Sequence, residues 1–330
     1  MTPATAAGYA EPQPVPVRAA AFELRPLSLG EVLDRTFAVY RGRFWLFAGL
    51  ASIAASVQLV ANAGLMFAAH FVRLHQSAAA ALGFRTIASY AVALVFFLVS
   101  AVTQAATVYA LGEVYLGRAA SVGLALRATA GRWYRYIGIA LWQAWSAVWV
   151  MALLLSPALV VLVLLPGRAG IAGAVLSGLL VFVAIFGGGA WGVYAFLRNS
   201  LGVQASVMEQ LTVRAAMRRS KFLSLGAKGR IFVVLLVAYA LLMVAGFVEL
   251  PMAFMMVRSP QVEHVAAEAS ILLISFFSNT LVAPVALIGL SLVYIDQRVR
   301  KEAYDLVLLL GEEVASAPNV PAAQGNDGAS

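Results

Sequence analysis

The chain of 330 residues contains no cysteine, which excludes disulfide bonds and metal sites built from thiolates. It contains three histidines, His70, His75 and His264, and all three lie in short connections between apolar segments. The sequence has no zinc-helix spacing, no Gly-Lys-Ser/Thr phosphate loop and no Gly-x-Ser-x-Gly elbow. We therefore expect a protein that is not an enzyme and that holds no cofactor or metal.

Charged residues are also scarce, at 12% of the chain, whereas hydrophobic residues make up 62% and the mean hydropathy is +0.88. Soluble domains average about 25% charged residues, so this chain has too few polar side chains to cover six buried helices. Stretches of about 25 nearly uncharged residues are long enough to cross a hydrocarbon core of about 30 Å. The sequence predicts an all-α integral membrane protein with six transmembrane helices, at about 44–69, 86–112, 137–165, 170–196, 231–257 and 269–295.

The two ends of the chain differ from this membrane domain, which we place at 24–310. Residues 1–23 and 311–330 are rich in Pro, Ala and Gly and contain too little apolar surface to offset the entropy of ordering. We predict a disordered N-terminal arm and a disordered C-terminal tail. The N-terminus also lacks the basic region and apolar core of a cleavable signal peptide.

The Lys and Arg residues are distributed unevenly between the connections. Of the 23 basic residues, 19 lie before the first predicted span, in alternate connections, and after the last span, against 4 in the other connections. Basic residues near span ends are retained in the cytoplasm, so both termini are predicted to be cytoplasmic. The net charge of +8 then serves topology and attraction to anionic headgroups. A nucleic-acid partner is not expected, because no soluble module carries a basic face with interleaved aromatic residues.

Three cytoplasmic segments are similar to one another: "SLGEVLDR" at 28–35, "SVGLALRA" at 121–128 and "TVRAAMRR" at 212–219. Each precedes a pair of spans, and the separations are 93 and 91 residues. Ser28 and Glu31 have the spacing of a capping box at a helix start. We predict three short amphipathic helices and a threefold repeat of helix plus hairpin, with chance similarity as the alternative. The first helix would present one apolar stripe of Leu29, Val32, Leu33, Phe37 and Tyr40.

Inside the spans, Glu249 is the clearest ionisable residue and therefore a candidate site. It lies toward the external end of its span, where it can reach interfacial water or Arg258, or instead serve a proton or substrate pathway. Uncharged amides can line a path or join helices by hydrogen bonds, and they are Gln58, Asn62, Gln104, Gln143 and Asn279. The glycine-rich segment 186–192 and prolines 157, 251 and 284 fit either unwound helices or close packing and kinks.

The sequence "YIDQRVRKEAYDL" at 294–306 follows the last span and carries dense charge. If the helix continues, residues 296 and 300, 298 and 302, and 301 and 305 pair at i,i+4, each pair contributing about 0.2–0.5 kcal/mol. We therefore interpret the segment as a docking helix beneath the bundle. The candidate partner or lipid contacts are Arg218, Arg219, Lys221, Arg298, Arg300 and Lys301.

Three segments, 24–45, 211–232 and 294–308, together resemble a bacterial integral membrane family known as the glycerophosphoryl diester phosphodiesterase membrane domain. The family usually has Gly where this chain has Ala303, and its central Arg-Ser pair is Arg219-Ser220 here. The resemblance implies a bacterial inner-membrane architecture. The phosphodiesterase activity of that name belongs to a soluble barrel of about 250 residues, for which this chain has no segment.

Two functions remain open at the level of the sequence. The first is a non-catalytic membrane scaffold or subunit that contacts a membrane or cytoplasmic protein partner through its basic cytoplasmic face. The alternative is a small-solute or lipid permease that uses Glu249 and the intramembrane amides. Replacement of Glu249 by Gln is expected to abolish the permease and to leave the scaffold intact.

Overall fold

The computed structural model describes residues 26–75, 77–164, 170–258 and 265–302, and these residues form helices without any strand. The predicted disordered arm and tail, His264 and Asp305 lie outside the described residues. Six helices are long and apolar enough to cross a membrane. The protein is thus an all-α, multi-pass membrane protein, as the composition predicted.

Each predicted span corresponds to one long helix, and most of these helices run further than predicted. They are α2 (Phe44–His75), α3 (Ala78–Tyr115), α5 (Trp133–Leu164), α6 (Gly170–Asn199), α9 (Lys228–Arg258) and α10 (Val265–Glu302). Residue 165, the last of the predicted span 137–165, lies outside the described residues. Helices α3 and α10 have 38 residues each, or about 57 Å at 1.5 Å per residue. Since a hydrocarbon core is about 30 Å thick, both helices have ends that project beyond it.

Four short helices occur in the described residues: α1 (Leu29–Gly42), α4 (Val122–Ala130), α7 (Gly202–Met208) and α8 (Val213–Ser224). Helices α1, α4 and α8 are the three predicted ones, and each precedes a hairpin of two long helices. Ser28 and Glu31 form the predicted capping box, and Ser121 caps α4, whereas Thr212 makes no side-chain capping bond. Helix α7 was not predicted, because its short apolar sequence continues the span before it.

Equivalent positions of the three short helices are buried alike, which supports the repeat. The residues four and eight positions after Ser28, Ser121 and Thr212 lie on one face, since i and i+4 are neighbours on a helix. All six are almost fully buried, and they are Val32 and Thr36, Ala125 and Thr129, and Ala216 and Ser220. The predicted stripe of α1 is shifted, because Val32, Thr36 and Val39 are buried whereas Phe37 is 42% exposed.

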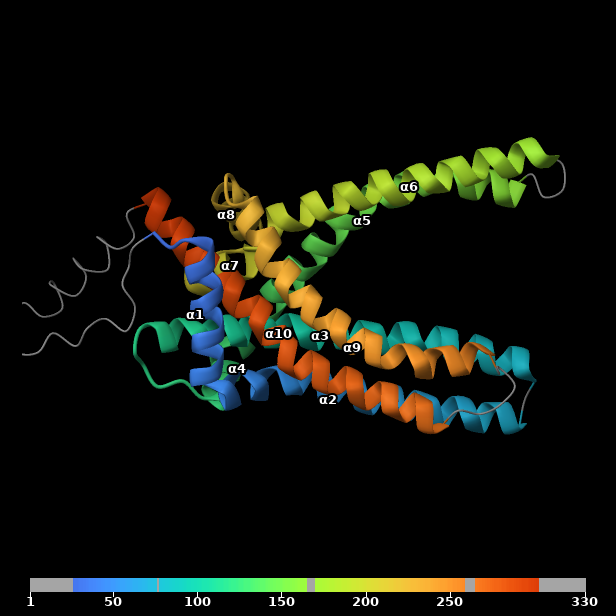
Figure 1. Ribbon diagram of the computed structural model, residues 1–330, viewed down its shortest axis with the longest axis horizontal. Helices are drawn as coiled ribbons and strands as arrows, with labels where there is room; N and C mark the ends of the chain where they lie inside the picture. The colour runs from blue at the N-terminus through green and yellow to red at the C-terminus, as the bar shows by residue number, and fades with distance from the viewer. Residues whose placement is uncertain (1–25, 76, 165–169, 259–264, 303–330) are drawn as a thin grey trace, which may run out of the picture.

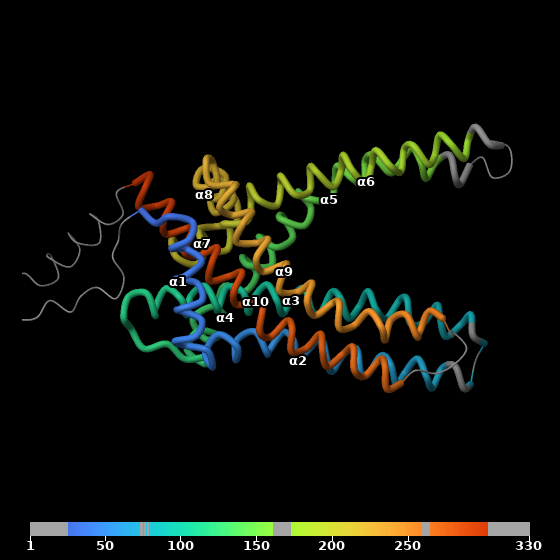
Figure 2. The backbone as a smooth tube through the Cα atoms, viewed as in Figure 1, coloured from blue at the N-terminus to red at the C-terminus, as the bar shows by residue number. Residues whose placement is uncertain are grey.

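The long helices form two arms that diverge from a common base (Figures 1 and 2). We call α2, α3, α9 and α10 the four-helix arm, in which α10 packs against α2, α9 and α3. Helices α5 and α6 form the hairpin arm. The base consists of α1, α4, α7, α8 and the adjoining ends of the long helices, and it holds the start of α1 and the end of α10 (Figure 1).

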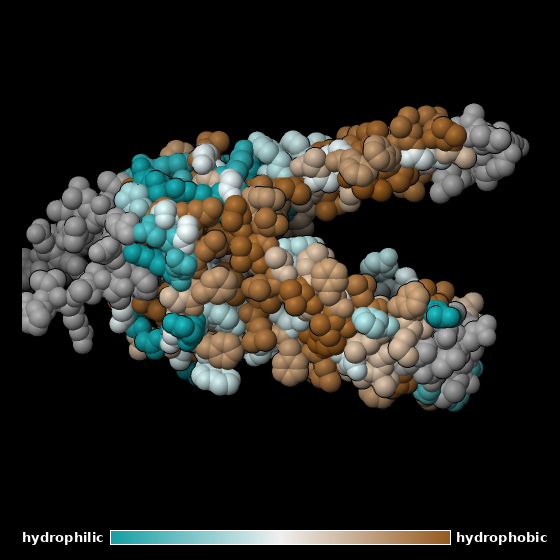
Figure 3. All heavy atoms as spheres, in the orientation of Figure 1, coloured by the Kyte–Doolittle hydropathy of each residue, from teal (hydrophilic) through white to brown (hydrophobic). Residues whose placement is uncertain are grey.

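The base contains the principal core of the protein. The largest fully buried side chains lie there, and they include Phe47, Leu50, Leu111, Ile139, Leu201, Met217, Leu223 and Tyr294. In the arms, by contrast, large apolar side chains are exposed along most of the surface, and polar residues gather at the base (Figure 3). This distribution fits a protein whose arms contact lipid, because lipid replaces the interior packing that a soluble helix would need.

The glycine-rich segment of α6 is used for close helix packing rather than for an unwound turn. A Cβ added at Gly188 would lie 2.6 Å from Met151 Cα of α5, and one added at Gly192 would lie 3.1 Å from Ala147 O. Small residues allow two membrane helices to approach closely. Helix α6 is continuous through this segment, and Pro157, Pro251 and Pro284 also lie inside helices.

Candidate functional site: the charged base and the outer face of α8

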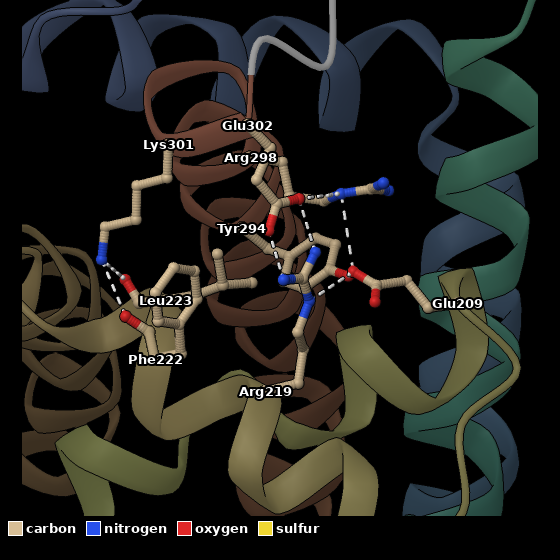
Figure 4. A network of polar contacts seen from close by, with 8 residues as sticks. All are labelled: Glu209, Arg219, Phe222, Leu223, Tyr294, Arg298, Lys301 and Glu302. Atoms are coloured by element: carbon tan, nitrogen blue, oxygen red, sulfur yellow. Dashed lines mark hydrogen bonds and ion pairs between the residues drawn. The ribbon is translucent and has the colours of Figure 1, made fainter. Parts of the chain in front are cut away.

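The last turns of α10 lie beside α8, and this contact joins most of the predicted contact residues (Figure 4). Helix α8 follows α7 after a short turn, in which Gln210 adopts a positive φ of 55°. This turn places Glu209, at the end of α7, between α8 and α10 (Figure 4). The two helices therefore meet around a carboxylate from a third element.

Arg219 of α8 connects the three elements. Its Nε donates to Glu209 Oε1 at 2.9 Å, and its Nη2 donates to Glu302 Oε2 at 2.5 Å, while Nη1 donates to the other oxygen of Glu302. Such a bidentate pair fixes both position and orientation. The hydrogen bonds to Glu302 raise the pKa of Arg219 above the ordinary value of a guanidinium group, whereas burial by itself would lower this pKa.

Two more side chains of α10 complete this cluster. The Tyr294 hydroxyl donates to Glu209 Oε1, and Arg298 Nε lies 3.5 Å from Glu209 Oε1 and 3.4 Å from Glu302 Oε2. Two carboxylates thus face two guanidinium groups, and the cluster is close to neutral. The predicted i,i+4 pair of Arg298 and Glu302 is present, as one part of this larger network.

Lys301 does not act as a free charge either. Its Nζ donates to the backbone carbonyls of Phe222 and Leu225 at 2.7 Å each, and to that of Leu223 at 3.3 Å. The last carbonyls of a helix lack partners within the helix, and a cation there also complements the helix dipole. Lys301 therefore caps the C-terminus of α8 from α10 (Figure 4).

A second cluster surrounds Asp296, whose side chain is fully buried. Arg230 Nη1 donates to Asp296 Oδ2 at 2.6 Å, and Arg300 Nε donates to the same oxygen at 2.9 Å. The backbone N–H of Leu27 donates to Oδ1 at 2.7 Å, while Arg300 Nη2 donates to Leu27 O at 2.6 Å. This predicted i,i+4 pair of Asp296 and Arg300 thus also anchors the chain just before α1.

The outer face of α8 carries the remaining predicted contacts. Ala216, Met217, Ser220, Leu223 and Ser224 face the core of the base. Three basic side chains lie on the other face at i, i+4 and i+7, and we call Arg214, Arg218 and Lys221 the α8 stripe. Arg214 and Arg218 are exposed, and Lys221 is half-buried. No ion pair of these three occurs within the described ranges.

The structure therefore divides the six predicted contact residues into two groups. Arg219, Arg298, Arg300 and Lys301 are engaged inside the base, whereas Arg218 and Lys221 remain on its outside. Sequence reasoning treated all six as one surface.

The intramembrane residues do not gather at one site. Glu249 of α9 is half-buried and accepts a hydrogen bond of 2.9 Å from Ser275 Oγ of α10. Asn62 and Asn279 donate to carbonyls four residues earlier in their own helices, at 2.8 Å each. Of the five predicted amides, Gln104 and Gln143 line a common cavity, which Glu249 does not line.

Glu209 and Asp296 are the central residues that sequence reasoning did not identify as site residues. Glu209 is the one acidic residue among seven basic residues between Arg198 and Arg230. This isolation was a usable signal, because a lone carboxylate in a basic segment is expected to find a cation. Among the described residues, no three His, Asp or Glu side chains form a group that could hold a metal ion.

Comparison of the chain with protein-family models, curated proteins and solved structures found no match. Inference about function therefore starts from the geometry of the base and the arms.

Proposed function

We propose that the protein is a non-catalytic scaffold or subunit of a bacterial inner membrane, which contacts a protein partner through the α8 stripe. In this proposal the base lies on the cytoplasmic side of the membrane, next to the anionic headgroups of that leaflet. The family resemblance of segments 24–45, 211–232 and 294–308 supports the bacterial inner membrane as the location.

The observation that carries the proposal is the contrast between the two faces of α8. The inner face is fixed by apolar packing, by Arg219 and by the cap from Lys301. The outer face holds the three cations of the α8 stripe, at i, i+4 and i+7. None of them forms an ion pair with a carboxylate among the described residues. A rigid helix with an uncompensated charge stripe is suited to an acidic partner surface, since complementary charge gives specificity and fast association.

The orientation of the arms supports a cytoplasmic base. Arg85 and Arg258 lie at the ends of α3 and α9 that are farthest from the base, whereas most of the described basic residues belong to the base. Lys and Arg are retained on the cytoplasmic side of membrane spans.

The permease alternative has weaker support. It would use Glu249 together with the intramembrane amides, but Glu249 contacts Ser275 within the four-helix arm, away from the cavity that Gln104 and Gln143 line. Asn62 and Asn279 bond to their own helices, as amides in packed membrane helices commonly do.

The test is a charge reversal of the stripe. The variant Arg214→Glu/Arg218→Glu/Lys221→Glu is compared with Arg43→Glu/Arg127→Glu/Arg132→Glu. The second variant makes the same change in net charge at exposed positions of α4 and of the turns that follow α1 and α4. A photo-crosslinking residue at position 225, exposed just after α8, reports partner contact in native membranes.

We expect a discrete crosslinked product of higher mass in the wild type and in the control variant, and its loss in the stripe variant. Equal loss in both variants would indicate general attraction to anionic lipid and would contradict a docking stripe. Retention of the product in the stripe variant would also overturn the proposal.

A further inference from the structure

A cavity of about 200 Å³ lies in the base, between the last turns of α3, the end of α7 and the last turns of α10. An engineered protein cavity of about 150 Å³ holds benzene, so this one has room for a ring with a short arm. Apart from Gly112, most of the remaining lining is apolar, and the residues with polar side chains are Tyr109, Glu113, Tyr115, Gln210 and Arg298.

Gly112 leaves the space beside α3 open. It lines the cavity, together with residues on either side of it in the same helix. A Cβ added at Gly112 would have no heavy atom within 4 Å. A larger side chain at this position can therefore enter the cavity without first meeting another residue, which gives a way to fill the cavity by mutation.

Glu113 brings a carboxylate to the lining. Its side chain is 18% exposed, and its carboxylate accepts no hydrogen bond within the described ranges. The one ion pair that it forms there is with Arg118, whose Nη1 lies 3.6 Å from Glu113 Oε1. Arg118 is 64% exposed and does not line the cavity. Water screens such a long, exposed pair, so Glu113 remains able to bind a further cation.

The guanidinium of Arg298 does not balance Glu113, because two other carboxylates already face it. Its Nε lies 3.5 Å from Glu209 Oε1 and 3.4 Å from Glu302 Oε2 (Figure 4). With Arg219, that cluster has two charges of each sign and is close to neutral. Glu113 is therefore the charge of the lining that the cluster leaves uncompensated.

Gln210 adds a second acceptor to the lining. Its Nε2 donates to Val207 O at 2.8 Å, and this bond orients the amide. The Oε1 atom of Gln210 accepts no hydrogen bond from the described part of the chain. A carboxylate and an amide oxygen together suit a ligand that has both a positive charge and several N–H donors. A primary ammonium group, with three donors, is such a ligand.

We propose that this cavity binds a primary ammonium group, which donates to the Glu113 carboxylate and has Gln210 Oε1 as a second acceptor. The apolar body of the ligand contacts the apolar lining. A free amine and the head of an ethanolamine phospholipid both present this group. The inference does not depend on the α8 stripe, so the two proposals fail separately.

The probe is radiolabelled 2-phenylethylamine, and its equilibrium binding is measured on the purified full chain in phosphatidylcholine nanodiscs. The ring and the two-carbon arm match the size of the cavity, and the amine is charged at neutral pH. The matched competitor is 2-phenylethanol, which keeps the ring and the arm and replaces the ammonium group with an uncharged hydroxyl. Empty nanodiscs give the background from the lipid.

We expect saturable binding of the amine, and at least tenfold weaker competition by 2-phenylethanol. Glu113→Gln removes the charge at nearly the same volume and is expected to weaken binding at least tenfold. Asp34→Asn removes a charge from an exposed position of α1 and is expected to bind as the wild type does.

A second pair of variants tests the location without changing any charge. Gly112→Leu fills the cavity and is expected to weaken binding at least tenfold. Its control is Gly123→Leu, at an exposed position of α4 that also has no heavy atom within 4 Å of an added Cβ and does not line the cavity. Gly123→Leu is expected to leave binding unchanged.

Nanodiscs that contain phosphatidylethanolamine separate the two sources of the ammonium group. At least fivefold weaker binding of the probe in these nanodiscs supports the lipid head as the ligand, and unchanged binding supports a free amine.

Four results would overturn the proposal. They are absence of saturable binding, equal competition by 2-phenylethanol, unchanged binding by Glu113→Gln, and equal binding by Gly112→Leu and Gly123→Leu. If Glu113→Gln does not fold, the alcohol and the glycine variants still decide the question.

Discussion

Replacement of Asp296 by Asn is the sharpest test of how the base is held together. Asn has nearly the same shape as Asp, and its Oδ1 can still accept the hydrogen bond from the Leu27 N–H. The change therefore removes the charge, and it also replaces Oδ2, which accepts hydrogen bonds from Arg230 and Arg300, with an amide donor. Arg230 and Arg300 keep their positions beside the buried side chain but lose their counter-charge.

The expected cost follows from burial. Removing one partner of a buried ion pair typically costs 3–5 kcal/mol, because the remaining charge stays desolvated. Asp296 has a side-chain exposure of 0%, whereas Arg230 and Arg300 are 28% and 33% exposed, so water compensates part of the loss. We therefore expect the low end of that range, about 3 kcal/mol.

The assay is thermal unfolding in detergent at one fixed scan rate, followed by size-exclusion chromatography or intrinsic fluorescence. In proteins of this size, 1 kcal/mol shifts the Tm by roughly 2 °C, so Asp296→Asn is expected to lower the Tm by about 6 °C. The control is Asp34→Asn, which removes the same charge from an exposed position of α1 and is expected to change stability by less than about 0.5 kcal/mol.

Equal Tm values for Asp296→Asn and Asp34→Asn would refute the reasoning, because they would mean that the buried carboxylate contributes no more than a surface one. An increase in Tm would refute it as well. It would show that the desolvation of Asp296 outweighs its attraction to the two guanidinium groups.

Three further predictions concern the arms and the membrane topology. Gly188→Ala is expected to lower the stability by about 1–3 kcal/mol in the same assay, because the added Cβ would overlap Met151 Cα. The control is Gly189→Ala, which has open space around the added Cβ and is expected to leave the Tm unchanged. Since the chain has no cysteine, Ala79→Cys and Arg132→Cys each create the sole thiol. A membrane-impermeant maleimide should label residue 79 in intact cells and residue 132 only after lysis. Labelling of residue 132, and not of residue 79, in intact cells would contradict the topology. Glu249→Gln keeps an acceptor for Ser275 and should leave the α8 crosslink unchanged. Loss of the crosslink in this variant would contradict a scaffold that acts through α8 alone.

The local structure was largely predictable from the sequence. The apolar runs located six helices, because any segment of that length and hydropathy must satisfy its backbone internally in a membrane. Ser28 and Glu31 located the start of α1, since the capping box depends on residues three positions apart. The i,i+4 pairs of α10 were also predictable, because helix geometry alone brings those side chains together.

The division of the basic residues into inner and outer groups was beyond sequence reasoning. Arg219 and Glu302 are 83 residues apart, and Leu27 and Asp296 are 269 apart, so no local periodicity connects them. Arg218 and Arg219 are neighbours in the chain, yet a rotation of 100° about the α8 axis places the first outside and the second against Glu209.

The sequence by itself determined that this protein is helical and crosses the membrane, and it predicted a short helix before each hairpin, because hydropathy and capping act over a few residues. The tertiary structure alone decided that the hairpins separate into two arms and that α7 completes the base. These features depend on which helix faces pack together, and that choice is made by the whole chain at once.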